Sequence, residues 1–301
     1  MKLATISRGR STGVAVIQGE AVVDLAELAK SGLAPQSVSP DMLGSMAIFL
    51  QQGRDVHAAL AEAAHLAADN GVGVSAIADC TFAPPVPTPQ KIIGVGMNYS
   101  DHCAEIGRPV PDSIQTFAMF ANTLVGHKGE VILPRHSEKM DWEAELVIVI
   151  GKQGKYISEE SAMSHIAGFT IGNDISARDF QFADKQTTRG KSGDTHSPLG
   201  PWIVTPDEIG DGTGLDISLS VNGVTKQSSN TDNLVFGPRE IVAFLSGYFT
   251  MQPGDLIFTG TPGGVGLGRN PQEWLKPGDD IEISIAGIGT LQSTCRAETT
   301  A

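Results

Sequence analysis

The sequence predicts an α+β protein that is mainly β, in which a small α/β unit precedes a larger strand-rich domain. Three observations support this fold class. The chain has 301 residues, which is enough for one large domain and a small one. Most of its 35 glycines lie after residue 90, as is typical of a turn-rich β structure. A cluster of prolines near residue 85 separates the two parts.

The first part contains short strands followed by helices. Residues 14–17 and 21–23 are strand candidates, because both are apolar and a glycine turn lies between them. Residues 41–70 are rich in alanine, and their apolar positions have helical spacing. We therefore expect a small N-terminal domain at residues 1–83.

The proline cluster is expected to be a stiff extended linker at residues 84–90, because neither a helix nor a central strand accommodates four closely spaced prolines. The second domain is expected at residues 91–301. Apolar runs between turn residues predict its strands at 91–95, 144–150, 166–171, 203–205, 217–221, 256–259 and 281–285. Helical spacing predicts short helices at 101–106, 158–165 and 239–248.

Charge and cysteine content limit the class of protein. A net charge of -13 would repel a phosphate backbone, so we expect no nucleic-acid partner. An anionic substrate would need a local cation to offset this charge. The three cysteines are widely spaced without a CxxC motif, which favours a reducing cytoplasm. The longest dense apolar run, residues 146–150, is too short to cross a membrane, so we expect no membrane contact.

Three acidic residues are candidate metal ligands. Glu143 and Glu145 would point to the same face of a strand that continues into a buried run. Asp174 ends another apolar stretch. Converging carboxylates at the edge of a core need a cation or a shared proton, and oxygen ligands suit Mg²⁺ or Mn²⁺. The alternative is that these acids are solvated strand ends.

Two further features are candidate catalytic groups. His102 and Glu105 would share one face of a helix, where the carboxylate orients the imidazole as a base. Lys191 lies in a polar segment that we expect to be a loop, where an ammonium group can stabilise a developing enolate. The glycine-rich residues 259–266 offer backbone amides to a carboxylate. The alternatives are a surface His–Glu pair, a solvated lysine and an ordinary turn.

Taken together, five segments resemble the fumarylacetoacetate hydrolase family, and its acylpyruvate hydrolase-like subgroup in particular. They are GVGMNYSDHCAE, DWEAELVIVIGK, GFTIGNDISARDFQ, GKSGDTHSPLGPW and GDLIFTGTPGGVG, which cover most of residues 91–268. The resemblance implies a twisted β-roll catalytic domain, commonly preceded by a small N-terminal domain. It also implies a homodimer.

The resemblance assigns roles to the acidic and histidine candidates. It implies that Glu143, Glu145 and Asp174 hold Mg²⁺ or Mn²⁺. It implies that His102 and Glu105 activate water, and that their segment closes over bound ligand.

Lys191 would line the enolate position in such an enzyme. The resemblance further implies substrate contacts from Tyr99, Arg178, Gln181 and Thr261. One departure is that Ala121 and Asn122 occupy a stretch where many relatives have a lysine, so no relative's substrate preference is transferred.

These features predict a hydrolase that cleaves a carbon–carbon bond in an acylpyruvate or another 1,3-diketo acid, a small anionic 2-oxo acid. Decarboxylation, isomerisation and hydration of related 2-oxo acids are alternatives, because they share the metal-stabilised enolate. A non-catalytic metal-binding protein is a further alternative. It has no use for a base such as His102.

Overall fold

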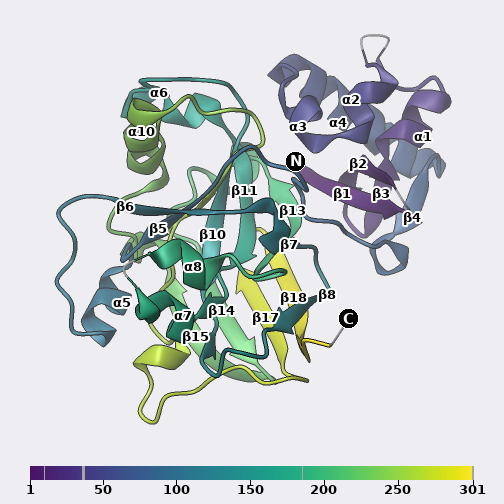
Figure 1. Ribbon diagram of the computed structural model, residues 1–301. Helices are drawn as coiled ribbons and strands as arrows, with labels where there is room; N and C mark the ends of the chain where they lie inside the picture. The colour runs from purple at the N-terminus through teal and green to yellow at the C-terminus, as the bar shows by residue number, and fades with distance from the viewer. Residues whose placement is uncertain (10, 36–37, 185, 300–301) are drawn as a thin grey trace.

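The computed structural model describes residues 1–9, 11–35, 38–184 and 186–299 (Figure 1). An N-terminal unit of strands and helices lies beside a larger part that is mainly strands. The mainly β α+β fold predicted from the sequence is therefore confirmed.

The N-terminal unit is an antiparallel meander covered by helices. Its strands are β1 (Lys2–Arg8), β2 (Ser11–Gln18), β3 (Ala21–Asp24) and β4 (Val74–Ala76). Its helices are α1 (Leu25–Lys30), α2 (Pro40–Gly44), α3 (Met46–Leu50) and α4 (Arg54–Asn70). The helical prediction for residues 41–70 is confirmed, but the helix is interrupted at Ser45 and between α3 and α4. Helix α4 ends at Gly71, whose φ of 69° is in the left-handed region that glycine tolerates.

The two parts share a sheet and a core. Strand β1 pairs with β13 (Ser197–Val204), with Leu3 opposite Ile203. Leu3 and Phe49 of the first part belong to the same buried cluster as Val147 and Leu199 of the second. The division into residues 1–83, 84–90 and 91–301 stays a proposal, because sheet and core both continue across it.

Among the described residues, the larger sheet has 11 strands. Besides β1–β4 and β13 it contains β5 (Ile92–Gly96), β6 (Gln115–Met119), β7 (Leu124–Val125), β10 (Ala144–Ile150), β11 (Ile166–Asn173) and β16 (Leu256–Phe258). Strand β10 is buried on both faces, as its sequence predicts. Val147 and Val149 face the core shared with the N-terminal unit, whereas Leu146 and Ile148 face the other core.

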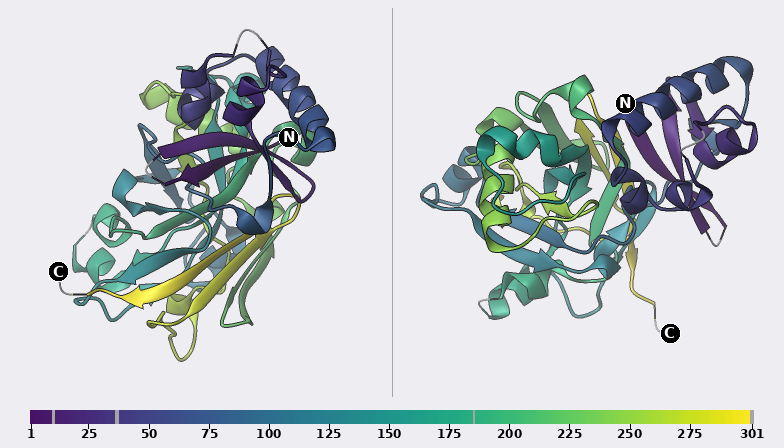
Figure 2. Two further views of the ribbon diagram at one scale, coloured as in Figure 1. Left: turned by 90° about the vertical axis from the view of Figure 1, so that its right-hand side faces the viewer. Right: turned by 90° about the horizontal axis from the view of Figure 1, so that it is seen from above.

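A second sheet of five strands closes that other core. Its strands, in spatial order, are β15 (Val224–Asn230), β14 (Asp216–Val221), β17 (Asp280–Ile285), β18 (Gly289–Ala297) and β8 (Gly129–Leu133). Figure 2 shows β17 and β18 in yellow, running beneath the larger sheet. Ile217, Ile281 and Leu291 pack with Leu146 and Ile148 between the two sheets.

Short helices and one small ribbon complete the second part. The helices are α5 (Ser100–Glu105), α6 (Glu159–Ala162), α7 (Arg178–Ala183), α8 (Thr187–Lys191), α9 (Pro206–Ile209) and α10 (Pro238–Tyr248). The ribbon pairs β9 (Met140–Asp141) with β12 (Ser176–Ala177). Every strand and helix predicted after residue 90 is present, although β13 begins six residues earlier than expected. Within the described chain, no helix is both long enough and apolar enough to cross a membrane.

Candidate active site

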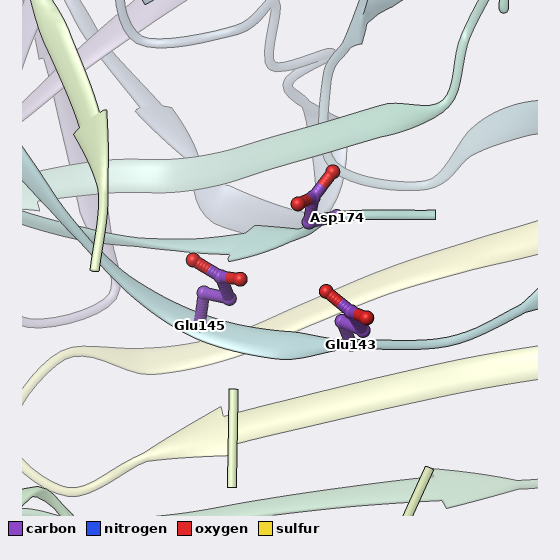
Figure 3. Close-up of side chains that lie close together, drawn as sticks. All are labelled: Glu143, Glu145 and Asp174. Carbon is purple, nitrogen blue, oxygen red and sulfur yellow. The ribbon is translucent and has the colours of Figure 1, made fainter. Parts of the chain in front are cut away.

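Three carboxylates converge where two central strands meet. Glu143 immediately precedes β10, Glu145 lies within it, and Asp174 follows β11. The strands pair antiparallel with Ala144 opposite Asn173, so the acids lie on both sides of one ladder end. One oxygen of each lies within 4.8 Å of the others, and Figure 3 shows the three side chains lying close together.

Two cations lie inside this acidic cluster. Arg178 Nη2 donates to Glu143 Oε1 at 2.6 Å and lies 2.8 Å from Asp141 Oδ2. Lys191 Nζ donates to Glu143 Oε2 at 2.6 Å and lies 2.7 Å from Asp174 Oδ2. Glu143 is therefore held by both cations at once.

Lys191 is not in a loop, so that prediction was wrong. It is the last residue of α8 and is 2 % exposed. The end of α8 is buried against the site. The ammonium group of Lys191 can therefore contact the carboxylates of Glu143 and Asp174. The alternative of a solvated lysine is also excluded.

The cluster carries two unbalanced negative charges. It consists of four buried carboxylates and two buried cations, namely Asp141, Glu143, Glu145, Asp174, Arg178 and Lys191. Both carboxylate oxygens of Asp174 are buried without an aligned hydrogen-bond donor, although the Lys191 ammonium is close to one of them. Buried charges need partners, so a doubly charged cation with oxygen preference, Mg²⁺ or Mn²⁺, fits this donor set.

The pKa shifts reflect the same imbalance. Burial raises the pKa of Glu145 well above its ordinary value, and the charges of Asp174 and Glu143 add to this effect. Burial raises the pKa of Asp174 to about 6 even though Lys191 opposes the change. Burial also acts on Glu143, but Lys191 and Arg178 outweigh it and lower its pKa to about 2. Glu143 is thus paired with two protein cations, whereas Asp174 shares Lys191 with it and the pKa of Glu145 stays raised.

His102 and Glu105 form the pair expected on α5. His102 Nδ1 lies 3.2 Å from Glu105 Oε2, and the second Glu105 oxygen accepts from Gly264 N at 2.9 Å. After the charges of Lys191 and Arg178, that of His102 also lowers the pKa of Glu143. A Cβ at Gly268 would lie 2.4 Å from Glu105 Cδ, so glycine is required for the loop to approach this closely. His102 is buried, whereas Glu105 is exposed, so the pair lies at the edge of the protein interior.

Sequence reasoning missed Asp141. Its carboxylate is fully buried and accepts from Arg178 Nε at 2.9 Å, Gly266 N at 2.6 Å and Leu267 N at 3.1 Å. Burial raises the pKa of Asp141 and Arg178 opposes this, but each of these contacts is a donor that suits the ionised form. The signal was present in the sequence, because Asp141 is two residues before Glu143 and continues the same alternation.

The four substrate-binding candidates have different surroundings. Tyr99 is buried, its hydroxyl has no hydrogen-bond partner, and burial followed by the charge of Glu145 raises its pKa. Gln181 Oε1 accepts from Arg178 Nη1 at 3.0 Å. Thr261 Oγ1 accepts from Gln227 Nε2 at 2.8 Å. The glycine-rich loop reaches the acids through Gly260 N, which donates to Glu145 Oε2 at 2.8 Å.

A cavity of about 1080 Å³ lies beside the end of α5. Its walls include Glu105 of α5, Leu267 of the glycine-rich loop and Thr187 at the start of α8. Glu105 belongs to the His102–Glu105 pair, whereas none of the six residues of the acidic cluster lines the cavity. The cavity therefore adjoins the His102–Glu105 pair.

Comparison with known proteins identifies the family. The model for "Fumarylacetoacetate (FAA) hydrolase C-terminal" matches residues 91–296. The mitochondrial oxaloacetate tautomerase FAHD2A of Bos taurus is 43 % identical over 254 residues, which is 84 % of this chain and 80 % of that protein. The 2,4-didehydro-3-deoxy-L-rhamnonate hydrolase of Sphingomonas sp. (strain SKA58) is 41 % identical over 234 residues, 75 % of this chain and 81 % of that protein.

A solved structure has the same fold. Maleylpyruvate hydrolase from Sphingobium sp. SYK-6, in complex with manganese(II) ion and pyruvate, has a TM-score of 0.79 and 29 % identity, and the match covers 99 % of this chain and all of that one. The fold matches over the whole chain, and the buried Glu–Glu–Asp cluster is consistent with a divalent metal. The chain belongs to the fumarylacetoacetate hydrolase family.

Proposed function

We propose that this enzyme enolises a 2-oxo acid at a divalent metal, and that its reaction is the keto–enol tautomerisation of an oxaloacetate-like substrate. The observation that carries the proposal is the buried acidic cluster with two unbalanced charges beside the His102–Glu105 pair. The choice among reactions is supported by the bovine relative, which is named an oxaloacetate tautomerase.

The three carboxylates Glu143, Glu145 and Asp174 would hold Mg²⁺ or Mn²⁺. When bound, such an ion supplies positive charge to the carboxylate and the 2-oxo oxygen of the substrate, where negative charge develops on enolisation. Arg178 and Lys191 keep Glu143 ionised, and Lys191 adds a positive charge on the same side.

The proton is moved by His102. Its Nδ1 faces Glu105, which fixes the tautomer and leaves Nε2 to take a proton from the carbon next to the oxo group. The electron pair of that C–H bond moves to form the carbon–carbon double bond, and the oxo oxygen becomes the enolate. Return of a proton to this oxygen gives the enol, and the reverse sequence gives the ketone.

The substrate contacts remain proposals, and the candidate residues differ in whether they already have a partner in the protein. The Tyr99 hydroxyl has no partner in the protein and is available to a ligand. Gln181 and Thr261 already have protein partners, so they would act by holding Arg178 and Gln227 in place. The expected homodimer and the cytoplasmic location also remain proposals.

Hydrolysis of a carbon–carbon bond in an acylpyruvate-like 1,3-diketo acid is the second candidate. The same His102–Glu105 pair can take a proton from water instead of carbon, and the resulting hydroxide would attack the distal carbonyl. Bond cleavage would then release a pyruvate enolate, stabilised at the same position. The rhamnonate and maleylpyruvate hydrolases among the relatives support this reading.

One experiment separates the candidates. The purified protein, with Mg²⁺ or Mn²⁺, is given oxaloacetate and acetylpyruvate in separate reactions. Enol absorbance follows tautomerisation, and released pyruvate follows decarboxylation or cleavage. We expect oxaloacetate ketone and enol to interconvert faster than with the metal alone. Pyruvate release from acetylpyruvate without this acceleration would favour the hydrolase, and no turnover of either substrate would overturn the proposal.

A further inference from the structure

One buried amide of the second sheet contacts the strand that carries two of the metal-ligand candidates. Strand β15 lies at the edge of that sheet, and of its seven residues, all of them described, Gln227 is the one that is buried. The ladder with β14 has Leu219 opposite Gln227, and the next pair skips one residue of β15, which is Lys226. A bulge of this kind bends a strand and re-aims the side chains beside it.

The Gln227 amide makes three hydrogen bonds, all of them within the protein. Its Oε1 accepts from Ala144 N at 2.9 Å, and its Nε2 donates to Thr261 Oγ1 and to Pro262 O, both at 2.8 Å. The positions of oxygen and nitrogen are fixed, because Ala144 N only donates and Pro262 O only accepts. Gln227 thus joins β10 to the glycine-rich loop.

Ala144 lies between two of the carboxylates, at a point where β10 has lost a neighbouring strand. Strand β16 pairs with β10 at Val147–Val149, but Gly260, which follows β16, donates its N–H to the Glu145 carboxylate. Ala144 is fully buried, so its N–H needs another acceptor. Gln227 Oε1 supplies this acceptor in place of a strand.

We infer that Gln227 is a positioning residue for the metal site. It fixes the backbone between Glu143 and Glu145, and it thereby sets how their carboxylates converge with that of Asp174. This inference rests on the proposed function, because the three carboxylates are the metal ligands proposed there. The alternative is that Gln227 holds the loop and the strands together without any effect on the metal, in which case its loss would reduce stability alone.

Manganese affinity separates these two roles. Electron paramagnetic resonance of free Mn²⁺ during a titration gives the Kd without any turnover. Gln227→Met keeps the length of the side chain but removes the amide, and we expect it to raise the Kd for Mn²⁺ roughly tenfold, as is typical when a partner of a metal ligand is lost. Its melting temperature in EDTA should also fall, since the buried N–H of Ala144 loses its acceptor.

A serine elsewhere in the protein provides a matched control. Ser246 of α10 is fully buried, and its Oγ accepts from Ile157 N at 2.8 Å. Ser246→Ala therefore also leaves a buried backbone N–H without its side-chain acceptor. We expect a lower melting temperature in EDTA, and a Kd for Mn²⁺ within about twofold of the parent value.

A second variant tests the same role without altering Gln227. Thr261→Val removes one of the two acceptors that hold Gln227 Nε2. We expect the Kd for Mn²⁺ to rise less than in Gln227→Met, roughly threefold. Circular dichroism checks that each variant is folded, and if Gln227→Met is not, Thr261→Val carries the test.

The outcomes are distinct. If the folded variants of Gln227 and Thr261 bind Mn²⁺ as tightly as the parent protein, the inference is wrong while the proposed function stands. A rise in Kd of the same size in Ser246→Ala would also overturn it, because the effect would then follow from any lost buried hydrogen bond. If the parent protein itself binds no Mn²⁺, the proposed function fails first.

Discussion

Two buried acidic sites in this protein have opposite charge balances. Asp255 is fully buried, but Lys91 Nζ lies 2.8 Å from its Oδ2, and both oxygens accept backbone hydrogen bonds, from Lys91 N at 3.1 Å and Gln252 N at 2.7 Å. In the acidic cluster, Asp174 is equally buried, but it shares Lys191 Nζ, 2.7 Å from its Oδ2, with Glu143, and no backbone N–H donates to either of its oxygens.

The difference shows that burial of an acid does not by itself indicate a metal site. The Asp255 site is complete without a ligand, so its role is to join the start of β5 to the turn before β16. The cluster of four acids and two cations is incomplete, since two buried carboxylates are left without a cation of their own, which is costly in a dry site. Only the second arrangement calls for a divalent ion.

Asn replacements at the two aspartates should have opposite consequences. Asp174→Asn removes a metal ligand, and we expect kcat/KM to fall by roughly a thousandfold or more, since the developing charge loses its stabilisation. In the presence of a chelator, this variant should be at least as stable to heat as the parent protein, because a buried repulsion is relieved. Turnover assays and thermal melts with EDTA measure both effects.

Loss of the base should reduce turnover but not metal binding. We expect His102→Ala to lower kcat roughly a hundredfold to a thousandfold, which is the range for removal of a general base. The Kd for Mn²⁺ should stay within about twofold, since His102 is not among the three carboxylates. An unchanged kcat would remove His102 from the mechanism and favour a non-catalytic role for the pair.

A substitution at Asp255, whose charge is balanced by Lys91, should change the stability of the protein and not its activity. Asp255→Asn removes the charge that pairs with Lys91 and leaves one backbone N–H without its acceptor. We expect a loss of roughly 2 kcal/mol in the free energy of unfolding, with or without metal, and unchanged kcat/KM. Urea denaturation with and without Mn²⁺ provides the measurement, and a metal-dependent loss would contradict the separation of the two sites.

A third buried group avoids the imbalance by losing its charge. Burial lowers the pKa of His196 to about 4, and its Nδ1 has no hydrogen-bond partner. Because the folded pKa lies below the value near 6.5 of an unfolded chain, the unfolded state takes up the proton first as the pH falls. Stability is therefore complete above that value and is lost as the pH drops toward 4.

At pH 5 this linkage should lower the free energy of unfolding by roughly 2 kcal/mol relative to pH 7. Urea unfolding of the parent and of His196→Gln at both pH values isolates the contribution. An identical pH dependence in the two proteins would show that His196 is not the titrating group.

The strands and the acids were readable from sequence because they follow local rules. The alternation at Glu143 and Glu145, and the two-sided apolar run after them, reflect one strand buried between two cores. Lys191 was misplaced because its helix has only five residues and is fixed by tertiary contacts, not by periodicity. The balance of charges in the acidic cluster could not be predicted from the sequence either, since Asp141 and Arg178 are brought together by the β9–β12 ribbon.

The central claim is that the unbalanced charge of Glu143, Glu145 and Asp174 is neutralised by one divalent ion. Crystals grown with Mn²⁺ and measured at the manganese absorption edge test it directly. We expect a single anomalous peak per chain, within about 2.3 Å of an oxygen of each of the three carboxylates. A fully occupied peak elsewhere, or none at saturating Mn²⁺, would contradict the claim.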